Sequence, residues 1–318
     1  MSISPGTWPR ASPLNRADRA QEGGGPSAPL LLSDREEPLP AVRLIALDLD
    51  GTLFNERGEI SREDAAAIRE ASDRGVTVVI STGRPYCGVP VEEVAPLGVN
   101  CALTVNGAAV YTLPDRKLLF DDCMDTRTAL GVLRDLEPLN LYYDVFIDGD
   151  AYSREDRRAL LEQTVLPESA KAYIRRTRIY ESDLLGRIER EALRVQKVTI
   201  NFCRQDGALT GREEAERILA AHPEITYVCG GNHNWEFNRA GVDKGSGLSR
   251  LMELMNVPLS TSMACGDSEN DLALFRTAGV SVAMANAPEG VKRAADFITR
   301  SNQEGGVALA IQHCIRGA

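Results

Sequence analysis

The stretch "LIALDLDGTLF", residues 44–54, places two carboxylates one residue apart at the end of an apolar run. The run predicts a strand buried on both faces, the kind of strand that parallel sheets contain. Because residues i and i+2 of a strand point to the same side, Asp48 and Asp50 would project together where the strand ends. Their repulsion needs a positive counter-charge, and Mg²⁺, which prefers oxygen ligands, would supply it. Gly51 then permits a tight turn towards a ligand.

Strands and helices alternate on both sides of the middle of the chain. A helix is predicted over 61–75, with Ser61 as its N-cap and Gly75 as its stop, and a second buried strand follows at 76–85. Strand, helix and strand in this order form a right-handed parallel unit. Further helices are expected over 244–256, 268–279, 287–295 and 304–315, and further strands at 261–267, 280–284 and 296–300. This alternation predicts an α/β fold with a doubly wound parallel sheet.

The middle of the chain, residues 125–235, lacks this clean alternation. Strand-like pieces at 140–153 and 192–203 stand between amphipathic helical stretches, a pattern that predicts an inserted α+β domain. The doubly wound core would then be built from residues 41–124 and 236–318.

Residues 1–40 have a different composition from the rest of the chain. They mix Pro, Gly, Ser and Arg around "EGGGPSAP", which offers too little apolar surface to form a packed core. We therefore expect a disordered leader, and both a targeting segment and an extended start remain open as its origin.

Composition excludes several classes of partner. The chain has 318 residues and a formal net charge of −10, which argues against nucleic acid or an anionic membrane surface, because both need a basic face. No run approaches the roughly 18 apolar residues of a membrane span. Seven cysteines without a CxxC pair and three scattered histidines favour reduced thiols and no zinc site, so we expect a cytoplasmic protein. The sequence predicts no particular oligomeric state.

Two further strand ends carry polar side chains. "STGRP" places Thr82 and Gly83 after the second strand, where a hydroxyl and accessible backbone N–H groups could hold a phosphate. Taken alone, this segment favours an ordinary helix cap followed by proline over a phosphate-binding loop. Taken alone, the first aspartate pair is likewise common at the end of an ordinary strand.

The segment "CGDSEND" places Asp267, Asn270 and Asp271 after a later strand and before a helix. A helix cap is the alternative here as well, whereas a calcium loop is rejected because Leu272 stands where that loop needs glycine. "VDKGSG" adds Lys244 near a helix start, and lysine is scarce in this arginine-rich chain, which has five. A lone surface lysine is usually only solvated.

These four segments, in this chain order, resemble the haloacid-dehalogenase superfamily, whose members carry DxDGT, a strand-terminal Ser or Thr, a Lys and a GDxxxD loop. Within it the chain is similar to the Cof-type branch of bacterial sugar phosphatases. The resemblance extends from Leu44 to Cys314 and rests on "LDLDGTL", "STGRPY", "VNGAAVY", "VDKGSGL", "GDSENDLALF", "VAMANA" and "SNQEGGVALAI".

The resemblance implies roles for the carboxylates. Asp48 matches the nucleophile that attacks phosphorus and becomes an aspartyl phosphate, and Asp50 matches the general acid and base. Mg²⁺ would be bound by Asp48, the backbone carbonyl of Asp50 and Asp267, with Asp271 in the same site or directly behind it.

The resemblance also implies which groups hold the non-bridging phosphate oxygens: Thr82, Gly83, Lys244 and Asn270. Arg84 and Asn106 have counterparts beside the site in the family, but either could brace a loop, so neither is included in the catalytic set.

The implied function is a Mg²⁺-dependent phosphatase of small phosphorylated metabolites, most of all sugar phosphates, with the insert closing as a lid over the strand ends. A phosphotransferase or mutase using the same chemistry is an alternative, and so is a non-hydrolytic phospho-acceptor or metabolite-binding module. Arg175, Arg176 and Arg178 of the insert could reach a second anionic group on the substrate.

Overall fold

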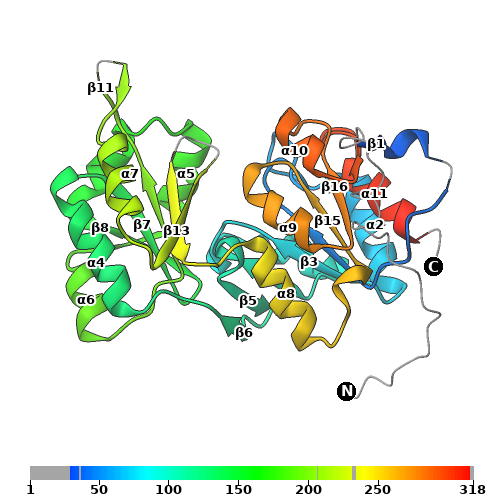
Figure 1. Ribbon diagram of the computed structural model, residues 1–318, viewed down its shortest axis with the longest axis horizontal. Coiled ribbons are helices and arrows are strands. Elements are labelled where there is room, and N and C mark those ends of the chain that lie inside the picture. The colour runs from blue at the N-terminus through cyan, green and yellow to red at the C-terminus, as the bar shows by residue number, and fades with distance from the viewer. Residues whose placement is uncertain (1–28, 36, 206, 231–233, 316–318) are drawn as a thin grey trace, which may run out of the picture.

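In the computed structural model, which describes residues 29–35, 37–205, 207–230 and 234–315, a nine-stranded sheet forms the larger lobe (Figure 1). Its order is β1-β17-β16-β15-β2-β3-β4-β5-β6, with β2 at the centre. All neighbours from β1 to β4 pair in parallel, whereas the β4–β5 and β5–β6 pairs are antiparallel, so β5 alone runs opposite to the other strands. The strands are β1 (Leu30–Leu31), β2 (Leu44–Leu47), β3 (Thr77–Ser81), β4 (Cys101–Thr104), β5 (Ala109–Thr112), β6 (Leu118–Asp121), β15 (Ser262–Gly266), β16 (Val280–Ala283) and β17 (Phe297–Ile298).

Helices cover both faces of this sheet. One face packs on α2 (Arg62–Asp73) and α11 (Gly306–Ile315), and the other packs on α8 (Lys244–Leu254), α9 (Leu272–Thr277) and α10 (Glu289–Ala294). Successive residues of a strand point to opposite faces, and both faces of β2 are buried because both find apolar partners. The predicted doubly wound α/β fold is confirmed, with an antiparallel edge that the sequence pattern did not reveal.

The insert forms the second lobe, and in the described part of it a six-stranded sheet has the order β13-β14-β10-β7-β8-β9 (Figure 1). Helices α4 (Thr126–Leu136), α6 (Leu184–Arg190) and α7 (Arg212–Ala220) pack on one face of this sheet. The strands of this sheet are β7 (Tyr142–Ile147), β8 (Asp150–Arg154), β9 (Arg178–Glu181), β10 (Lys197–Asn201), β13 (Ile225–Cys229) and β14 (Trp235–Arg239). Helix α5 (Glu168–Thr177) precedes β9. β11 (Arg204–Gln205) and β12 (Ala208–Leu209) pair antiparallel in a separate two-stranded sheet. We call this lobe the cap.

Two predicted boundaries differ from the structure. β14 pairs with β10 and β13, so the chain returns to the core after Arg239 rather than at residue 236. The prediction of a disordered leader over 1–40 is wrong for its last part, because β1 pairs with β17, and Leu32 and Leu39 are buried in the core. Residues 30–32 and 39 are leucines, but the composition averaged over residues 1–40 is too polar to reveal this local apolar surface. Residues 1–28 lie outside the described residues.

The described chain contains no helix long and apolar enough to cross a membrane.

Candidate functional site

The carboxyl end of β2 lies beside the N-terminus of α8, so two residues far apart in the sequence form a buried ion pair. Lys244 Nζ lies 2.7 Å from Asp48 Oδ1 and 2.6 Å from Asp271 Oδ1. The lysine is completely buried, which lysines tolerate only when their charge is compensated. Two carboxylates around one ammonium leave this buried cluster with an excess negative charge.

The sequence of α8 explains how Lys244 reaches this position. Asp243 caps the helix by accepting a hydrogen bond from the Ser246 N–H, so the helix begins at the lysine. A Cβ atom at Gly245 would lie 2.5 Å from the Ala273 carbonyl oxygen, so only glycine allows α8 to pack this closely on α9.

A third carboxylate joins the cluster at the end of β15. Oxygen atoms of Asp48, Asp267 and Asp271 lie within 4.8 Å of one another. Thr52 Oγ1 donates to Asp267 Oδ1 at 2.9 Å. Gly51 has φ +88°, and a Cβ there would lie 2.3 Å from Asp267 Oδ2, so glycine is required by both the turn and the close approach. We call Asp48, Asp267 and Asp271 the carboxylate group.

Asp271 shapes the loop that carries Asp267. Its Oδ2 accepts the N–H groups of Asp267 and Ser268, both at 3.0 Å, while its Oδ1 accepts from Lys244. Ser268 and Asp271 also form a capping box at the short 3-10 helix Glu269–Asp271, so the helix cap considered as an alternative for this segment is present as well. One aspartate both caps the short helix and positions the lysine.

Burial and mutual repulsion control the protonation of the carboxylate group. Burial, followed by the charge of Asp271, raises the pKa of Asp267 to about 6. Burial also raises the pKa of Asp48, an effect that Lys244 opposes. Burial acts to lower the pKa of Lys244, but Asp271 and Asp48 outweigh it and hold that pKa above its usual value, so the lysine stays charged. The group therefore favours a second cation close to Asp267.

Asp50 is oriented differently from Asp48. Its carboxylate is half exposed and receives the Arg84 guanidinium as a fork, Nε to Oδ2 at 2.8 Å and Nη2 to Oδ1 at 2.5 Å. The same guanidinium lies over the Phe54 and Tyr173 rings, at 5.4 and 5.0 Å from their centroids. The side chain of Asp50 thus lies outside the carboxylate group, and Arg84, omitted from the predicted set, is its direct partner.

The loop after β3 brings the predicted phosphate-binding residues to the same edge of the sheet. Thr82 is buried, and its hydroxyl accepts the Arg84 N–H. Asn270 Oδ1 accepts from Ser268 Oγ at 2.7 Å, and its amide nitrogen lies 3.5 Å from Asn106 Oδ1. Thr82, Gly83, Asp267 and Asn270 line one cleft together with Asp48 and Asp50.

Cap residues complete this cleft. Lys197 Nζ, from β10, donates to the Gly83 carbonyl at 2.7 Å and forms an ion pair with Glu236 at 2.9 Å. Glu236, from β14, also accepts from the Asn106 side-chain amide at 2.7 Å. Sequence reasoning missed Lys197 and Glu236, and the scarcity of lysine was the one available signal. The cap is therefore tied directly to the predicted phosphate loop.

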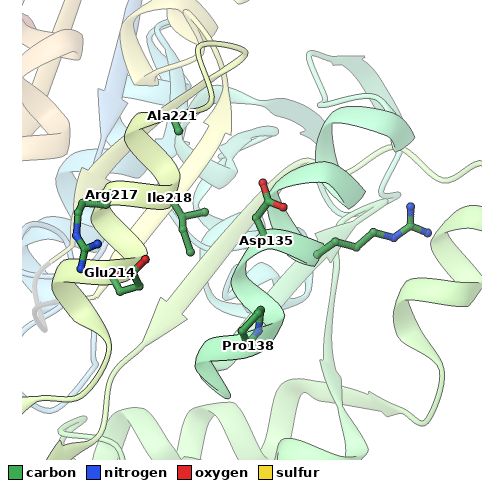
Figure 2. Close-up of a pocket in the computed structure, with 7 residues that line it drawn as sticks. Asp135, Pro138, Glu214, Arg217, Ile218 and Ala221 are labelled. Carbon is green, nitrogen blue, oxygen red and sulfur yellow. Dashed lines mark ion pairs between the residues drawn. The ribbon is translucent and has the colours of Figure 1, made fainter.

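The cleft between the lobes has a volume of about 640 Å³ and is lined by both of them. Figure 2 shows another hollow, of about 430 Å³, between α4 and α7 on the outside of the cap. It is lined by Asp135, Pro138, Glu214, Arg217 and Ile218 among others, and none of its lining residues belongs to the predicted site. The cleft that contains the carboxylates is therefore the candidate active site.

Comparison with known proteins finds similar sequences and structures over most of the chain. A family model described as haloacid dehalogenase-like hydrolase matches residues 45–311. Phosphatase YwpJ of Bacillus subtilis strain 168 is 32% identical over 287 residues, which are 86% of this chain and 100% of that protein. The 5-amino-6-(5-phospho-D-ribitylamino)uracil phosphatase YcsE of the same strain is 32% identical over 281 residues, 86% of this chain and 96% of that protein. A solved haloacid dehalogenase-like hydrolase from B. subtilis aligns with a TM-score of 0.72 and 31% identity, covering 85% of this chain and 99% of that one.

Proposed function

Since this chain belongs to the haloacid dehalogenase-like hydrolases and is a phosphatase, we propose that it hydrolyses small phosphorylated metabolites, sugar phosphates above all, with Mg²⁺ and through an aspartyl phosphate on Asp48. One observation supports this more than any other: Asp48 lies buried against Lys244 and two further carboxylates and still lines a cleft open to a ligand. The name of one relative, a ribitylaminouracil phosphate phosphatase, is consistent with a small metabolite as substrate.

In the first half of the proposed reaction, a carboxylate oxygen of Asp48 attacks phosphorus and the bond to the ester oxygen breaks. Asp50 donates a proton to the departing alkoxide. In the second half, Asp50 takes a proton from water, the water oxygen attacks phosphorus, and phosphate leaves Asp48 free again. Because Arg84 holds both oxygens of Asp50, it has to release one of them before Asp50 carries the proton.

Four groups would hold the phosphate during transfer. The Thr82 hydroxyl, the Gly83 backbone, the Lys244 ammonium and the Asn270 amide all lie around the carboxyl end of the sheet. Lys244 supplies a point charge that stays fixed by Asp48 and Asp271. A preformed array of this kind stabilises charge without having to reorganise during the reaction.

The carboxylate group fits a hard cation. It offers only oxygen atoms, and the raised pKa of Asp267 marks a place where negative charge is not fully compensated. Asp48, Asp267 and the backbone carbonyl of Asp50 would hold Mg²⁺, with Asp271 supporting Asp267. The ion would offset the repulsion between Asp48 and the phosphate, which is about 4 kcal/mol for unit charges about 4 Å apart at an effective dielectric constant of about 20.

Removal of divalent ions is expected to abolish phosphate release from p-nitrophenyl phosphate, and Mg²⁺ is expected to restore it. The physical reason is that an anionic nucleophile and an anionic ester would then repel each other without compensation. Phosphate release is measured in EDTA, and again after excess Mg²⁺ is added to the same sample. Full activity in EDTA would refute the proposed metal dependence.

The stabilisation of the protein by Mg²⁺ is expected to grow with pH. The pKa of Asp267 is raised from 3.8 to about 6, so the folded chain binds more protons than the unfolded chain between these values. The ion-free protein therefore loses stability as pH rises through this window, and the loss persists above about pH 6. Mg²⁺ needs the ionised carboxylate, so the melting temperature should increase more on adding Mg²⁺ at about pH 7.5 than at about pH 5.

The matched control for this prediction is Asp267→Asn, which removes the titrating group. In this variant the difference between the two pH values should shrink. Equal increases in melting temperature at both pH values in the unmodified protein would contradict the assignment of Asp267 to the metal.

A further inference from the structure

The turn Val105–Gly107, which follows β4, has an unusual backbone. The φ angles of Val105, Asn106 and Gly107 are +48°, +57° and +96°. Glycine adopts this left-handed region freely, whereas a β-branched residue such as Val105 rarely does. Such conformations cost free energy, persist only where the surrounding contacts hold them, and cluster at functional sites. We call these three residues the junction turn.

The junction turn holds the loop after β3 on both sides of Gly83. The Asn106 N–H donates to the Thr82 carbonyl at 3.1 Å. The Val105 N–H donates to the Arg84 carbonyl at 2.9 Å. The loop that is expected to bind the phosphate therefore has the junction turn as its support.

The peptide group between Gly83 and Arg84 has both of its polar atoms fixed. Its carbonyl accepts from Lys197 Nζ of the cap at 2.7 Å, and its N–H donates to Thr82 Oγ1 at 3.1 Å. A hydroxyl group has a single proton. Because Thr82 Oγ1 accepts this N–H, the proton of the hydroxyl points elsewhere and can be donated to a phosphate oxygen. Lys197 thus orients the Thr82 hydroxyl indirectly, through one peptide group.

The side chain of Asn106 connects the cap to Asn270. It is buried, and its Nδ2 donates to Glu236 Oε2 of the cap at 2.7 Å. Only the nitrogen of the amide can donate to a carboxylate, so this contact turns Asn106 Oδ1 towards Asn270, whose Nδ2 lies 3.5 Å away. Asn270 Oδ1 accepts from Ser268 Oγ at 2.7 Å. With its oxygen held and one amide hydrogen facing Asn106, Asn270 keeps its second hydrogen for a phosphate.

Lys197 and Glu236 form one buried pair that reaches both of these donors. Their side-chain atoms lie 2.9 Å apart, and 2% of the Lys197 side chain and 15% of the Glu236 side chain are exposed. Each charge compensates the other, which is the condition for burying either of them. The contacts form a closed ring between the two lobes that runs through Gly83, Lys197, Glu236 and Asn106.

The three cap arginines that the sequence singled out take no part in this ring. Arg178 Nη2 is paired with Asp144 Oδ2 at 3.0 Å. Arg175 forms surface ion pairs with two glutamates, each at 2.7 Å, and Arg176 is exposed. Of the three, only Arg178 lines the cleft, so the structure gives no support to the expectation that all three reach a second anionic group.

We propose that Asn106, Glu236 and Lys197 are positioning residues of the phosphatase reaction. The cap pair and the junction turn together aim the Thr82 hydroxyl and the Asn270 amide at the transferring phosphate. The inference rests on the phosphatase function proposed above and adds three residues that act through others. Donors that are fixed in advance stabilise the transition state most, so losing this arrangement lowers kcat more than it raises KM.

Asn106→Gly tests the link through the junction turn. Glycine adopts a φ of +57° freely, so the variant loses the side chain without straining the backbone. With p-nitrophenyl phosphate and Mg²⁺, kcat is expected to fall by about 10–100-fold and KM to change by less than about threefold. Asn256→Gly is the matched control, because Asn256 is exposed, has a φ of +53° and lies outside the cleft. It should leave both constants as they are.

Inhibition constants add a readout that a purely structural contact would not move. Orthovanadate adopts the five-coordinate geometry of a transferring phosphoryl group, whereas inorganic phosphate resembles the product. In Asn106→Gly the inhibition constant of vanadate is expected to rise at least about tenfold relative to that of phosphate. An unchanged ratio of the two constants would show that Asn106 does not act on the transition state, and the proposal would be wrong.

Lys197→Met and Glu236→Gln, singly and together, separate positioning from stability. Lys197→Met leaves a buried carboxylate without its cation and should lower the melting temperature. The double variant has no unpaired charge, so its melting temperature should recover. Its Gly83 carbonyl still lacks the donor, so kcat should stay at least about tenfold below that of the unmodified protein. Recovery of kcat together with the melting temperature would show that the pair only holds the fold.

Failure of this inference is distinguishable from failure of the phosphatase function. If the unmodified protein releases no phosphate from p-nitrophenyl phosphate with Mg²⁺, the proposed function falls and this inference falls with it. If it does release phosphate and Asn106→Gly has an unchanged kcat, the positioning role is wrong and the phosphatase function stands. Melting curves show whether each variant is folded, and the double variant decides the question should Asn106→Gly not fold.

Discussion

Asp48→Asn is expected to lower phosphate release by about 10⁴-fold or more while leaving the protein folded and no less stable, in line with losses seen when a covalent nucleophile is removed. The amide is a very poor nucleophile, so no aspartyl phosphate can form. Stability should not fall, because burial already raises the pKa of Asp48 and the amide oxygen can still accept from Lys244. The measurements are kcat/KM with Mg²⁺ and the melting temperature.

The matched control is Asp73→Asn, which makes the same change on the exposed last residue of α2. It should alter neither quantity. An Asp48→Asn protein with wild-type activity would exclude the covalent mechanism. An inactive variant with a much lower melting temperature would instead indicate that Asp48 acts mainly in holding the fold.

Lys244→Met is expected to reduce both activity and stability. Without the ammonium, Asp48 and Asp271 become buried carboxylates with no cation between them, and breaking a buried ion pair in this way costs about 3–5 kcal/mol of unfolding free energy. Loss of a charge aimed at the transferring phosphate should lower kcat/KM by about 10²–10³-fold. Denaturant unfolding and steady-state kinetics measure the two effects.

Lys292→Met provides the comparison, because Lys292 forms a surface pair with Glu289 on α10 at 3.1 Å. A surface pair contributes at most about 1 kcal/mol, so this variant should remain active and nearly as stable. A Lys244→Met protein that behaved like Lys292→Met would show that the lysine is not part of the catalytic site. Added Mg²⁺ should recover part of the stability lost in Lys244→Met, because the ion compensates the same carboxylates.

Local patterns were enough to predict the architecture of the core. The apolar run before Asp48, the cap at Ser61 and the stop at Gly75 each describe a segment of a few residues, and the structure has β2 and α2 there. The carboxyl ends of parallel strands meet at one edge of a sheet, so polar residues at several strand ends become neighbours once the fold class is known.

Other features depend on contacts that no local pattern encodes. Arg84 was left out of the predicted set because its side chain could equally brace a loop, and its fork on Asp50 exists only because β2 and β3 are adjacent. Leu32 and Leu39 stood in a leader of low average hydrophobicity, yet each has a place in the core. Hydrophobicity averaged over a window of residues cannot show that a single side chain packs against partners elsewhere in the fold.

The sequence by itself determined the doubly wound core, the aspartate pair after β2 and the polar residues at the other strand ends, because periodicity and strand-end position are properties of short segments. Only the tertiary structure decided that Asp48 pairs with Lys244 while Asp50 pairs with Arg84. It also decided that Lys197 of the cap, which is paired with Glu236, reaches the loop at Gly83. The hydrogen bond from Lys197 to Gly83 joins residues 114 positions apart, and it forms only when the two separately packed lobes come together. Its energy depends on burial and on the orientation of the cap, neither of which a linear pattern contains.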